Sequence, residues 1–173
     1  CIRDSPDNRR VTPKMYLTAM SQQTNDKLPE PMVLMPYLAG RERSVDMVVE
    51  NGEVIAAVCR RKEGALQSIE QSGVAFELAK TCAQIMQADG LVNVQTRDDA
   101  NGKPYLLEIN MRPSGGVCYS LSCGINLSGI FALRKLGIID KETAIKMGTD
   151  GFKPVVVRSV SSVIALTEQQ SAE

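Results

Sequence analysis

Residues 90–116, GLVNVQTRDDANGKPYLLEINMRPSGG, decide the fold. Two runs of mostly β-forming residues, 91–97 and 105–110, flank the dipeptide Asn101-Gly102. That dipeptide between two such runs is the strongest short signal for a β-hairpin. Ser114 and two glycines follow the second run, and backbone N–H groups of such a loop can approach an anion closely. The stretch therefore predicts two paired strands that end in a small polar loop.

A turn centred on Asn101-Gly102 fixes the predicted register of this hairpin. Gln95 then faces Glu108, and Asn93 faces Asn110. Because side chains two apart on a strand share a face, Gln95, Glu108 and Asn110 project from one patch. One carboxylate beside two amide oxygens suits Mg²⁺ that keeps phosphate oxygens as further ligands.

The polar residue that follows this hairpin points to the same chemistry. Arg112 lies one strand step beyond Asn110, and its planar guanidinium suits phosphate oxygens. Alternating polar residues are also typical of a solvated sheet face. On spacing alone, both the metal site and the solvated face stay open as interpretations.

Composition limits the function classes. The 173 residues fit one domain or one large piece of a larger domain, and 43% are hydrophobic. The 20 basic and 20 acidic residues cancel, which favours neither nucleic acid nor an anionic membrane as a partner. Histidine is absent, so His-based triads and His metal sites are excluded and a metal must be held by oxygen. Five cysteines without metal-ligand spacing suit a reducing cytoplasm.

Local patterns predict the remaining elements. Asn51-Gly52 joins two β-rich runs and predicts a second hairpin. From Ser72, a predicted N-cap, the period changes to that of a helix with a stop at Gly90. Its predicted inward face is Ala75, Leu78, Ala79, Cys82, Ile85 and Met86. The other predicted elements are helices at 13–22, 127–136 and 140–147 and strands at 31–38, 44–50, 53–60 and 154–166.

The stretch 90–116 resembles the metal-binding end of the ATP-grasp superfamily, and in particular its branch of carbamoyl phosphate synthetase large subunits. Residues 33–64, VLMPYLAGRERSVDMVVENGEVIAAVCRRKEG, are similar to the adenine-hinge strand, the G-x-E turn and the next hairpin of that superfamily. The resemblance covers residues 31–137. It implies that the chain has an α+β fold, the C-terminal portion of the ATP-grasp fold, in which helices flank an antiparallel sheet. Residues 1–30 would be a polar remnant of an upstream subdomain, and 31–173 the nucleotide- and metal-binding portion.

The resemblance also implies roles for individual residues. Backbone groups of Met35 and Leu38 would meet the adenine, and Glu42 would hold the ribose hydroxyls. Arg112 would neutralise charge on the transferred phosphoryl group. One or two Mg²⁺ ions, with Mn²⁺ as an alternative, would bridge the ATP phosphates from Gln95, Glu108 and Asn110. Arg60, Arg61 and Lys62 lie where related carboxylases place basic residues near the acceptor, although a solvated basic turn fits them equally well.

Three departures from the superfamily pattern bear on these roles. Met35 and Pro36 stand in the hinge where many members carry Glu and Lys, and Met111 replaces the proline of Asn-Pro-Arg. No lysine-bearing strand or glycine-rich flap precedes the hinge in this sequence. We therefore expect the chain to be the C-terminal part of a longer enzyme, inactive alone, with the N-terminal half as its missing partner.

The resemblance implies an ATP-dependent ligase. Such an enzyme activates a carboxylate as an acyl phosphate, which an amine or similar nucleophile then attacks. The expected partners are a small-molecule carboxylate and nucleophile, without nucleic acid or membrane, and a homo-oligomer is compatible with the sequence. Two alternatives stay open: a non-catalytic nucleotide-binding or regulatory module, and a half-domain whose ATP site a partner chain completes.

Overall fold

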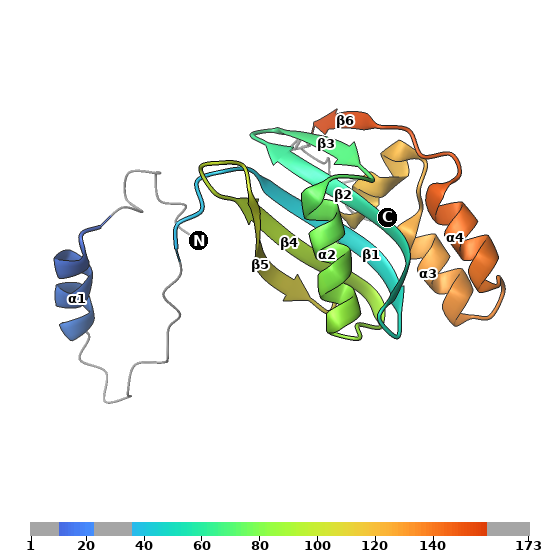
Figure 1. The fold of residues 1–173 in the computed structure, drawn as a ribbon, viewed down its shortest axis with the longest axis horizontal. Coiled ribbons are helices and arrows are strands. Elements are labelled where there is room, and N and C mark those ends of the chain that lie inside the picture. Colours follow the sequence, from blue (N-terminus) through green and yellow to red (C-terminus); the bar gives the residue numbers. More distant parts are fainter. Residues whose placement is uncertain (1–10, 23–35, 159–173) are drawn as a thin grey trace, which may run out of the picture. The chain divides into compact units, whose positions relative to one another are not determined.

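The computed structural model describes residues 11–22 and 36–158 (Figure 1). They belong to two compact units, Cys1–Pro36 and Tyr37–Glu173. The predicted boundary at residue 30 lies outside the described residues. In the first unit, the helix predicted at 13–22 is confirmed as α1, Pro13–Ser21, which Thr12 caps by accepting from the Met15 N–H at 3.2 Å.

The second unit is an α+β fold, as predicted. Its strands form one six-stranded sheet in the order β5-β4-β1-β2-β3-β6, and every neighbouring pair is antiparallel (Figure 1). The strands are β1 Glu42–Glu50, β2 Glu53–Glu63, β3 Leu66–Glu70, β4 Gly90–Asp98, β5 Pro104–Asn110 and β6 Val155–Arg158. The helices are α2 Val74–Ile85, the 3₁₀-helix η2 Val117–Cys123, α3 Leu127–Lys135 and α4 Lys141–Thr149.

Both predicted hairpins form. The first turns at Asn51 and Gly52, whose φ angles of 48° and 80° are those of a tight left-handed turn. In the second, Gln95 pairs with Glu108 and Asn93 with Asn110, so the predicted register is confirmed there. Nearer the turn the register shifts by one residue, because a bulge inserts Leu107 between Leu106 and Glu108.

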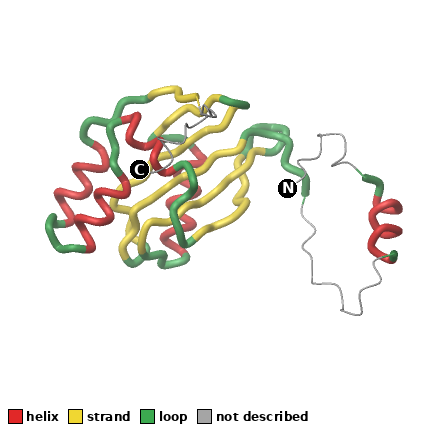
Figure 2. The backbone as a smooth tube through the Cα atoms, turned by 180° about the vertical axis from the view of Figure 1, so that it is seen from behind, coloured by secondary structure: helices red, strands yellow, loops and turns green. Residues whose placement is uncertain are grey.

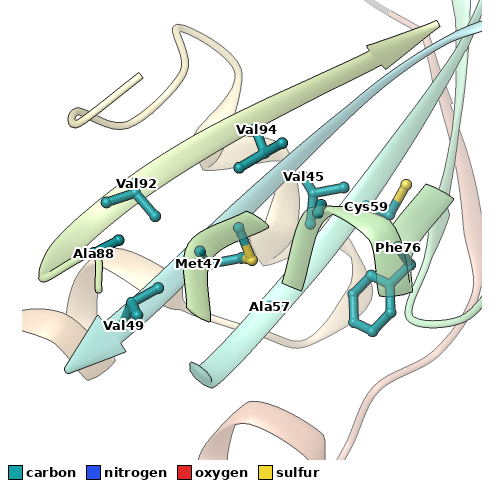
Figure 3. Close-up of a cluster of buried hydrophobic side chains, with 11 residues drawn as sticks. Val45, Met47, Val49, Ala57, Cys59, Phe76, Ala88, Val92 and Val94 are labelled. Carbon is teal, nitrogen blue, oxygen red and sulfur yellow. The ribbon is translucent and has the colours of Figure 1, made fainter. Parts of the chain in front are cut away.

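One face of the sheet packs against α2 (Figure 3). Alternate residues of β1, β2 and β4 supply this core, and α2 adds Phe76, Ala79 and Ala83. The predicted ends of this helix are wrong: its N-cap is Gly73 rather than Ser72, and it ends before Met86. Because Ile85 and Met86 lie at that end, they are 76% and 59% exposed instead of facing inward.

The opposite face packs against η2, α3 and α4 (Figures 1 and 2). Its core contains Leu127, Ile130 and Ala144 from α3 and α4, and Ile125 from the segment between η2 and α3, all fully buried. The helices predicted at 127–136 and 140–147 are confirmed as α3 and α4. Within the described ranges no single helix is long and apolar enough to span a membrane, and only η2 and α3 taken together, bent by 107°, meet that length and composition.

One strand was not predicted, and three further predictions differ from the structure or are described only in part. β3 was not predicted, because its sequence LQSIE is short and mostly polar. Gly90 does not stop a helix but begins β4, with a φ angle of 116°. The strand predicted at 31–38 is a loop at residues 36–38, and the remainder lies outside the described residues. The strand predicted at 154–166 is observed as β6, and residues 159–166 lie outside the described residues.

Candidate functional site

The sheet face that packs against α3 and α4 is apolar at one end of its strands and polar at the other. On β1, Val48 lies in the core, whereas Asp46 and Ser44 on the same face are polar. On β2 and β4, the residues paired with Ser44 are also polar, and those paired with Val48 are also apolar. We call Glu42, Ser44, Asp46, Arg60, Lys62, Asn93 and Gln95 the polar end of this face, and Val48, Ala56, Val58 and Leu91 its apolar end.

The three predicted metal ligands lie together beside the polar end. Gln95 is paired with Glu108 across β4 and β5, and Asn110 follows on the same face. The Asn110 amide donates to Glu108 Oε1 at 2.9 Å, which leaves Asn110 Oδ1 and Glu108 Oε2 available. The Gln95 amide nitrogen donates to Asn93 Oδ1 at 3.4 Å, so its oxygen is also available.

These oxygens fit a hard cation that brings its own further ligands. Glu108 supplies the one carboxylate among three side chains, and Mg²⁺ usually completes its shell with waters and phosphates. Across residues 11–22 and 36–158, no group of three His, Cys, Asp or Glu side chains could hold a metal. A metal at this place would therefore depend on the amide oxygens and on phosphate, and the metal role of these residues stays a prediction.

A depression of about 390 Å³ opens over the polar end. It is lined by Ser44, Arg60, Lys62, Gln67, Gln95, Arg112, Ser114, Gly115, Gly116 and Tyr119. The structure thus brings Arg112 to the same depression as Gln95, as the predicted site requires. Arg112 is exposed and donates to the Pro113 carbonyl at 3.2 Å. Unlike Arg60 and Lys62, it has no acidic partner within the described part of the chain.

The three basic residues of β2 do not form a solvated turn, so that interpretation is wrong. The Arg60 side chain is 5% exposed and bridges to Asp46 at 3.3 Å. Arg61 bonds Glu70 at 2.8 Å, and alternation turns it to the other face of the sheet. Lys62 pairs with Glu42 and lines the depression.

Asp46 and Arg60 hold the loop after β5. Asp46 Oδ1 accepts from the Ser114 backbone N–H at 2.9 Å, and Oδ2 accepts from the Ser114 hydroxyl at 2.7 Å. Arg60 Nη2 donates to Ser114 Oγ at 2.6 Å. Gly116 lies so close that an added Cβ would meet Arg60 Nη1 at 2.5 Å. A glycine at this position therefore lets the loop lie against the arginine.

The predicted adenine hinge is described only in part. Met35 lies outside the described residues, and Leu38 is half-buried in the loop before β1. Gly40 N–H donates to the Asp98 carbonyl at 2.8 Å, and Asp98 N–H donates to the Arg41 carbonyl at 2.9 Å. These bonds hold the loop against β4, but the adenine role of Met35 and Leu38 stays a prediction.

Glu42, predicted to hold ribose, begins β1 at the polar end. Its carboxylate is paired with Lys62, which faces it directly across β1 and β2. A ribose hydroxyl at this carboxylate would share it with the lysine. The ribose role of Glu42 stays a prediction.

A family model described as "ATP-grasp in the biosynthetic pathway with Ter operon" matches residues 28–159. The chain belongs to this ATP-grasp family. The fold of this ATP-grasp chain is thus the one that the sequence predicted, whereas its assignment to the carbamoyl phosphate synthetase branch stays a prediction. A comparison with curated proteins finds no match.

Solved structures similar to this ATP-grasp chain include the phosphoribosylaminoimidazole carboxylase ATPase subunit from Aquifex aeolicus. The two share 13% sequence identity and a TM-score of 0.47, and the match covers 62% of this chain and 36% of that one. An L-amino acid ligase from Bacillus licheniformis matches at a TM-score of 0.43 and 19% identity, over 58% of this chain and 29% of that one. The chain therefore spans about a third of the length of these solved structures.

Sequence reasoning missed Ser44 and Asp46 of this ATP-grasp chain. Both are buried, at 1% exposure each, within a strand that otherwise supplies core residues. A signal was present: in SVDMVV, residues 44–49, two polar residues occupy alternate positions of an otherwise apolar run. Buried polar groups need hydrogen-bond partners, and here those partners come from distant segments.

Proposed function

We propose that this chain supplies the nucleotide- and metal-binding half of an ATP-dependent ligase, of the branch that resembles carbamoyl phosphate synthetase. The reaction would activate a carboxylate as an acyl phosphate, which an amine or similar nucleophile attacks, with release of ADP and phosphate. The observation that carries this proposal is the position of Gln95, Glu108 and Asn110, which share a sheet face beside the depression that Arg112 lines.

In this proposal, Gln95, Glu108 and Asn110 hold Mg²⁺, or Mn²⁺ in its place, together with the phosphates of ATP. The bound ion would supply positive charge that offsets the phosphate charge. The role of the protein is to fix three oxygens on two adjacent strands. Paired strands suit this task because their backbone hydrogen bonds hold the side chains in a fixed register.

Arg112 is proposed as the catalytic residue that stabilises charge on the moving phosphoryl group. The charges around the depression favour Arg112, because Asp46 offsets Arg60 and Glu42 offsets Lys62. Arg112 contributes the positive charge that no carboxylate of the depression balances. Fixed positive charge aimed at a transferring phosphoryl group is the main source of catalysis in such reactions.

The remaining parts of the nucleotide site are proposed from the sequence resemblance. Met35 and Leu38 would bind adenine through their backbones, and Glu42 would bind ribose. As the resemblance implies, a flap and a lysine from the upstream half would close over ATP. A small-molecule carboxylate and a nucleophile are the proposed substrates. The four cysteines within the described residues are free, which fits the proposed reducing, cytoplasmic location.

The test is ADP release by the complete enzyme across a Mg²⁺ titration. Glu108→Gln keeps the side-chain shape but removes the one carboxylate of the proposed metal site, and should lower Mg²⁺-dependent release about 100-fold or more. Arg112→Ala should lower turnover far more than nucleotide affinity, because its charge is needed mainly as the phosphoryl group moves.

Glu77→Gln is the matched control, since it neutralises an exposed carboxylate on α2. It should leave ADP release unchanged. Unchanged turnover in the Glu108→Gln enzyme would rule out the metal role and leave only a polar sheet face.

A further inference from the structure

The carboxylate of Asp46 is the most deeply buried acid of the polar end. Its side chain is 2% exposed, although a solitary buried carboxylate is costly unless hydrogen bonds and a counter-charge surround it. Arg60 supplies the counter-charge at 3.3 Å. Asn93 donates to Asp46 Oδ1 at 3.2 Å. The remaining donors come from Ser114, which lies 68 residues further along the chain.

Ser114 is the point at which the loop after β5 is attached to the sheet. Within the described residues, the hydrogen bonds from segment 111–116 to β1 and β2 all run through Ser114, to Asp46 and from Arg60. Ser114 Oγ also accepts from the Gly116 N–H at 3.2 Å, which shapes the loop itself. One buried carboxylate therefore fixes both the backbone and the side chain at the centre of the loop.

The same carboxylate orients Arg60. Nη2 of this arginine lies between Asp46, Ser44 and Ser114, while Nη1 donates to Gln67 at 2.9 Å. Arg60 in turn lies beneath Gly116 and over the ring of Tyr119, with its guanidinium carbon 5.9 Å from the ring centre. Asp46 thus holds Arg60 and Ser114, two of the residues that line the depression.

We propose that Asp46 is a positioning residue for the reaction. It holds Arg60 and the 114–116 loop so that Arg112, two residues before Ser114, faces the depression. This inference rests on the proposed function, and it adds a residue that contacts neither nucleotide nor metal in that proposal. Misplacing a charged group near the reacting atoms by about 1 Å can cost about 100-fold in rate.

Asp46→Asn tests the hydrogen bonds that Asp46 accepts from Ser114 and Arg60 with the smallest change of side-chain shape. All the groups facing the two carboxylate oxygens are donors, from Ser114, Asn93 and Arg60. An asparagine amide can replace only one of those oxygens, and its NH₂ group would then face a donor. The substitution also leaves Arg60 without its counter-charge. It should therefore free the loop while β1 and β2 stay paired.

The experiment measures three quantities in the complete enzyme: hydrogen exchange of segment 112–117, affinity for Mg–ADP, and ADP release. For Asp46→Asn we expect exchange in that segment to rise about tenfold or more. ADP release should fall about tenfold or more, with Mg–ADP affinity within about threefold of wild type. Loss of turnover without loss of affinity is the result that a purely structural role would not give.

Two further variants complete the test. Glu50→Gln removes another ion-paired carboxylate of the same strand, which binds Arg134 at 2.8 Å at the opposite end, and should change neither exchange in 112–117 nor turnover. If Asp46→Asn does not fold, Ser114→Ala carries the test, because it removes only the hydroxyl half of the link. It should speed exchange in 112–117 and lower turnover about threefold or more.

Failure of the positioning role and failure of the proposed function give different results. Unchanged turnover with faster exchange would overturn the positioning role alone, and so would equal losses of affinity and turnover. A wild-type enzyme that does not bind Mg–ADP would overturn the proposed function, and the positioning role with it.

Discussion

The apolar end and the polar end of one sheet face are built from the same strands, yet they are closed in different ways. At the apolar end, η2, α3 and α4 bury residues such as Leu127 and Ile130 completely. At the polar end, a short loop held by Asp46 and Arg60 leaves a depression of about 390 Å³. The change takes place within one strand, between Val48 and Asp46.

The difference shows that the apolar end contributes more of the stability, whereas the polar end carries the proposed site. Burying apolar area yields about 25 cal/mol per Å², so the helices at the apolar end contribute stability directly. A buried ion pair such as Asp46–Arg60 adds little net stability, because desolvation offsets most of the attraction. The polar end is thus held in place by the rest of the sheet. Three substitutions should separate the two ends.

The largest expected effect is at the apolar end. Leu127→Ala removes a fully buried side chain and should lower the free energy of unfolding by about 2–5 kcal/mol. Urea unfolding measures it. Leu136→Ala, at a position 72% exposed, is the control and should change stability by less than about 0.5 kcal/mol. Equal losses for the two leucines would show that the helices do not close this end.

A smaller effect on stability is expected at the polar end. In Gly116→Ala, the new Cβ would lie 2.5 Å from Arg60 Nη1, so the arginine or the loop must move. The free energy of unfolding should fall by about 1–2 kcal/mol, and ADP release should fall with it. For the unfolding measurement Gly115→Ala is the matched control, because a Cβ there meets no atom within 4 Å. Identical behaviour of the two variants would contradict the described loop.

The smallest expected effect is an acid-dependent one at the apolar end. Hydrogen bonds from Arg134 lower the pKa of Glu50 below its ordinary value of 4.5. The stability from this pair is therefore present above pH 4.5 and is lost as the pH falls through the lower, folded-state pKa. Glu50→Gln should lower the urea midpoint slightly at neutral pH and not at all in strong acid. A difference that persists in strong acid would show that the carboxylate charge is not responsible.

Local signals explain what the sequence predicted correctly. Asn51-Gly52 specifies its turn within two residues, and both hairpins form where the two dipeptides predict them. Gln95 lies opposite Glu108 because the bulge at Leu107 offsets a one-residue shift nearer the second turn. The bulge at Leu107 was not readable, because it depends on pairing across β4 and β5. β3 escaped prediction because its sequence LQSIE is short and mostly polar, and because one of its two neighbours, β6, comes from a distant segment.

The link between Asp46, Arg60 and Ser114 could not be predicted from local pattern. These residues come from three segments, and the bond from Ser114 to Asp46 spans 68 positions. The alternation of Ser44 and Asp46 within β1 was a local signal of buried polar residues, but it does not say which distant groups bind them. The sequence resemblance indicated the proposed ligand residues, whose roles stay predictions, whereas the structure shows what holds the loop beside them.

The central claim is that a metal–nucleotide complex binds at the polar end of this sheet face. Manganese broadens nuclear magnetic resonance signals of nearby amides, so Mn–ADP added in small amounts to the isotope-labelled complete enzyme tests this claim most directly. We predict the strongest broadening at Gln95, Glu108 and Asn110, weaker broadening at Val48 and Leu127, and loss of this pattern in the Glu108→Gln enzyme. Broadening centred on the apolar end, or unchanged by Glu108→Gln, would contradict the account.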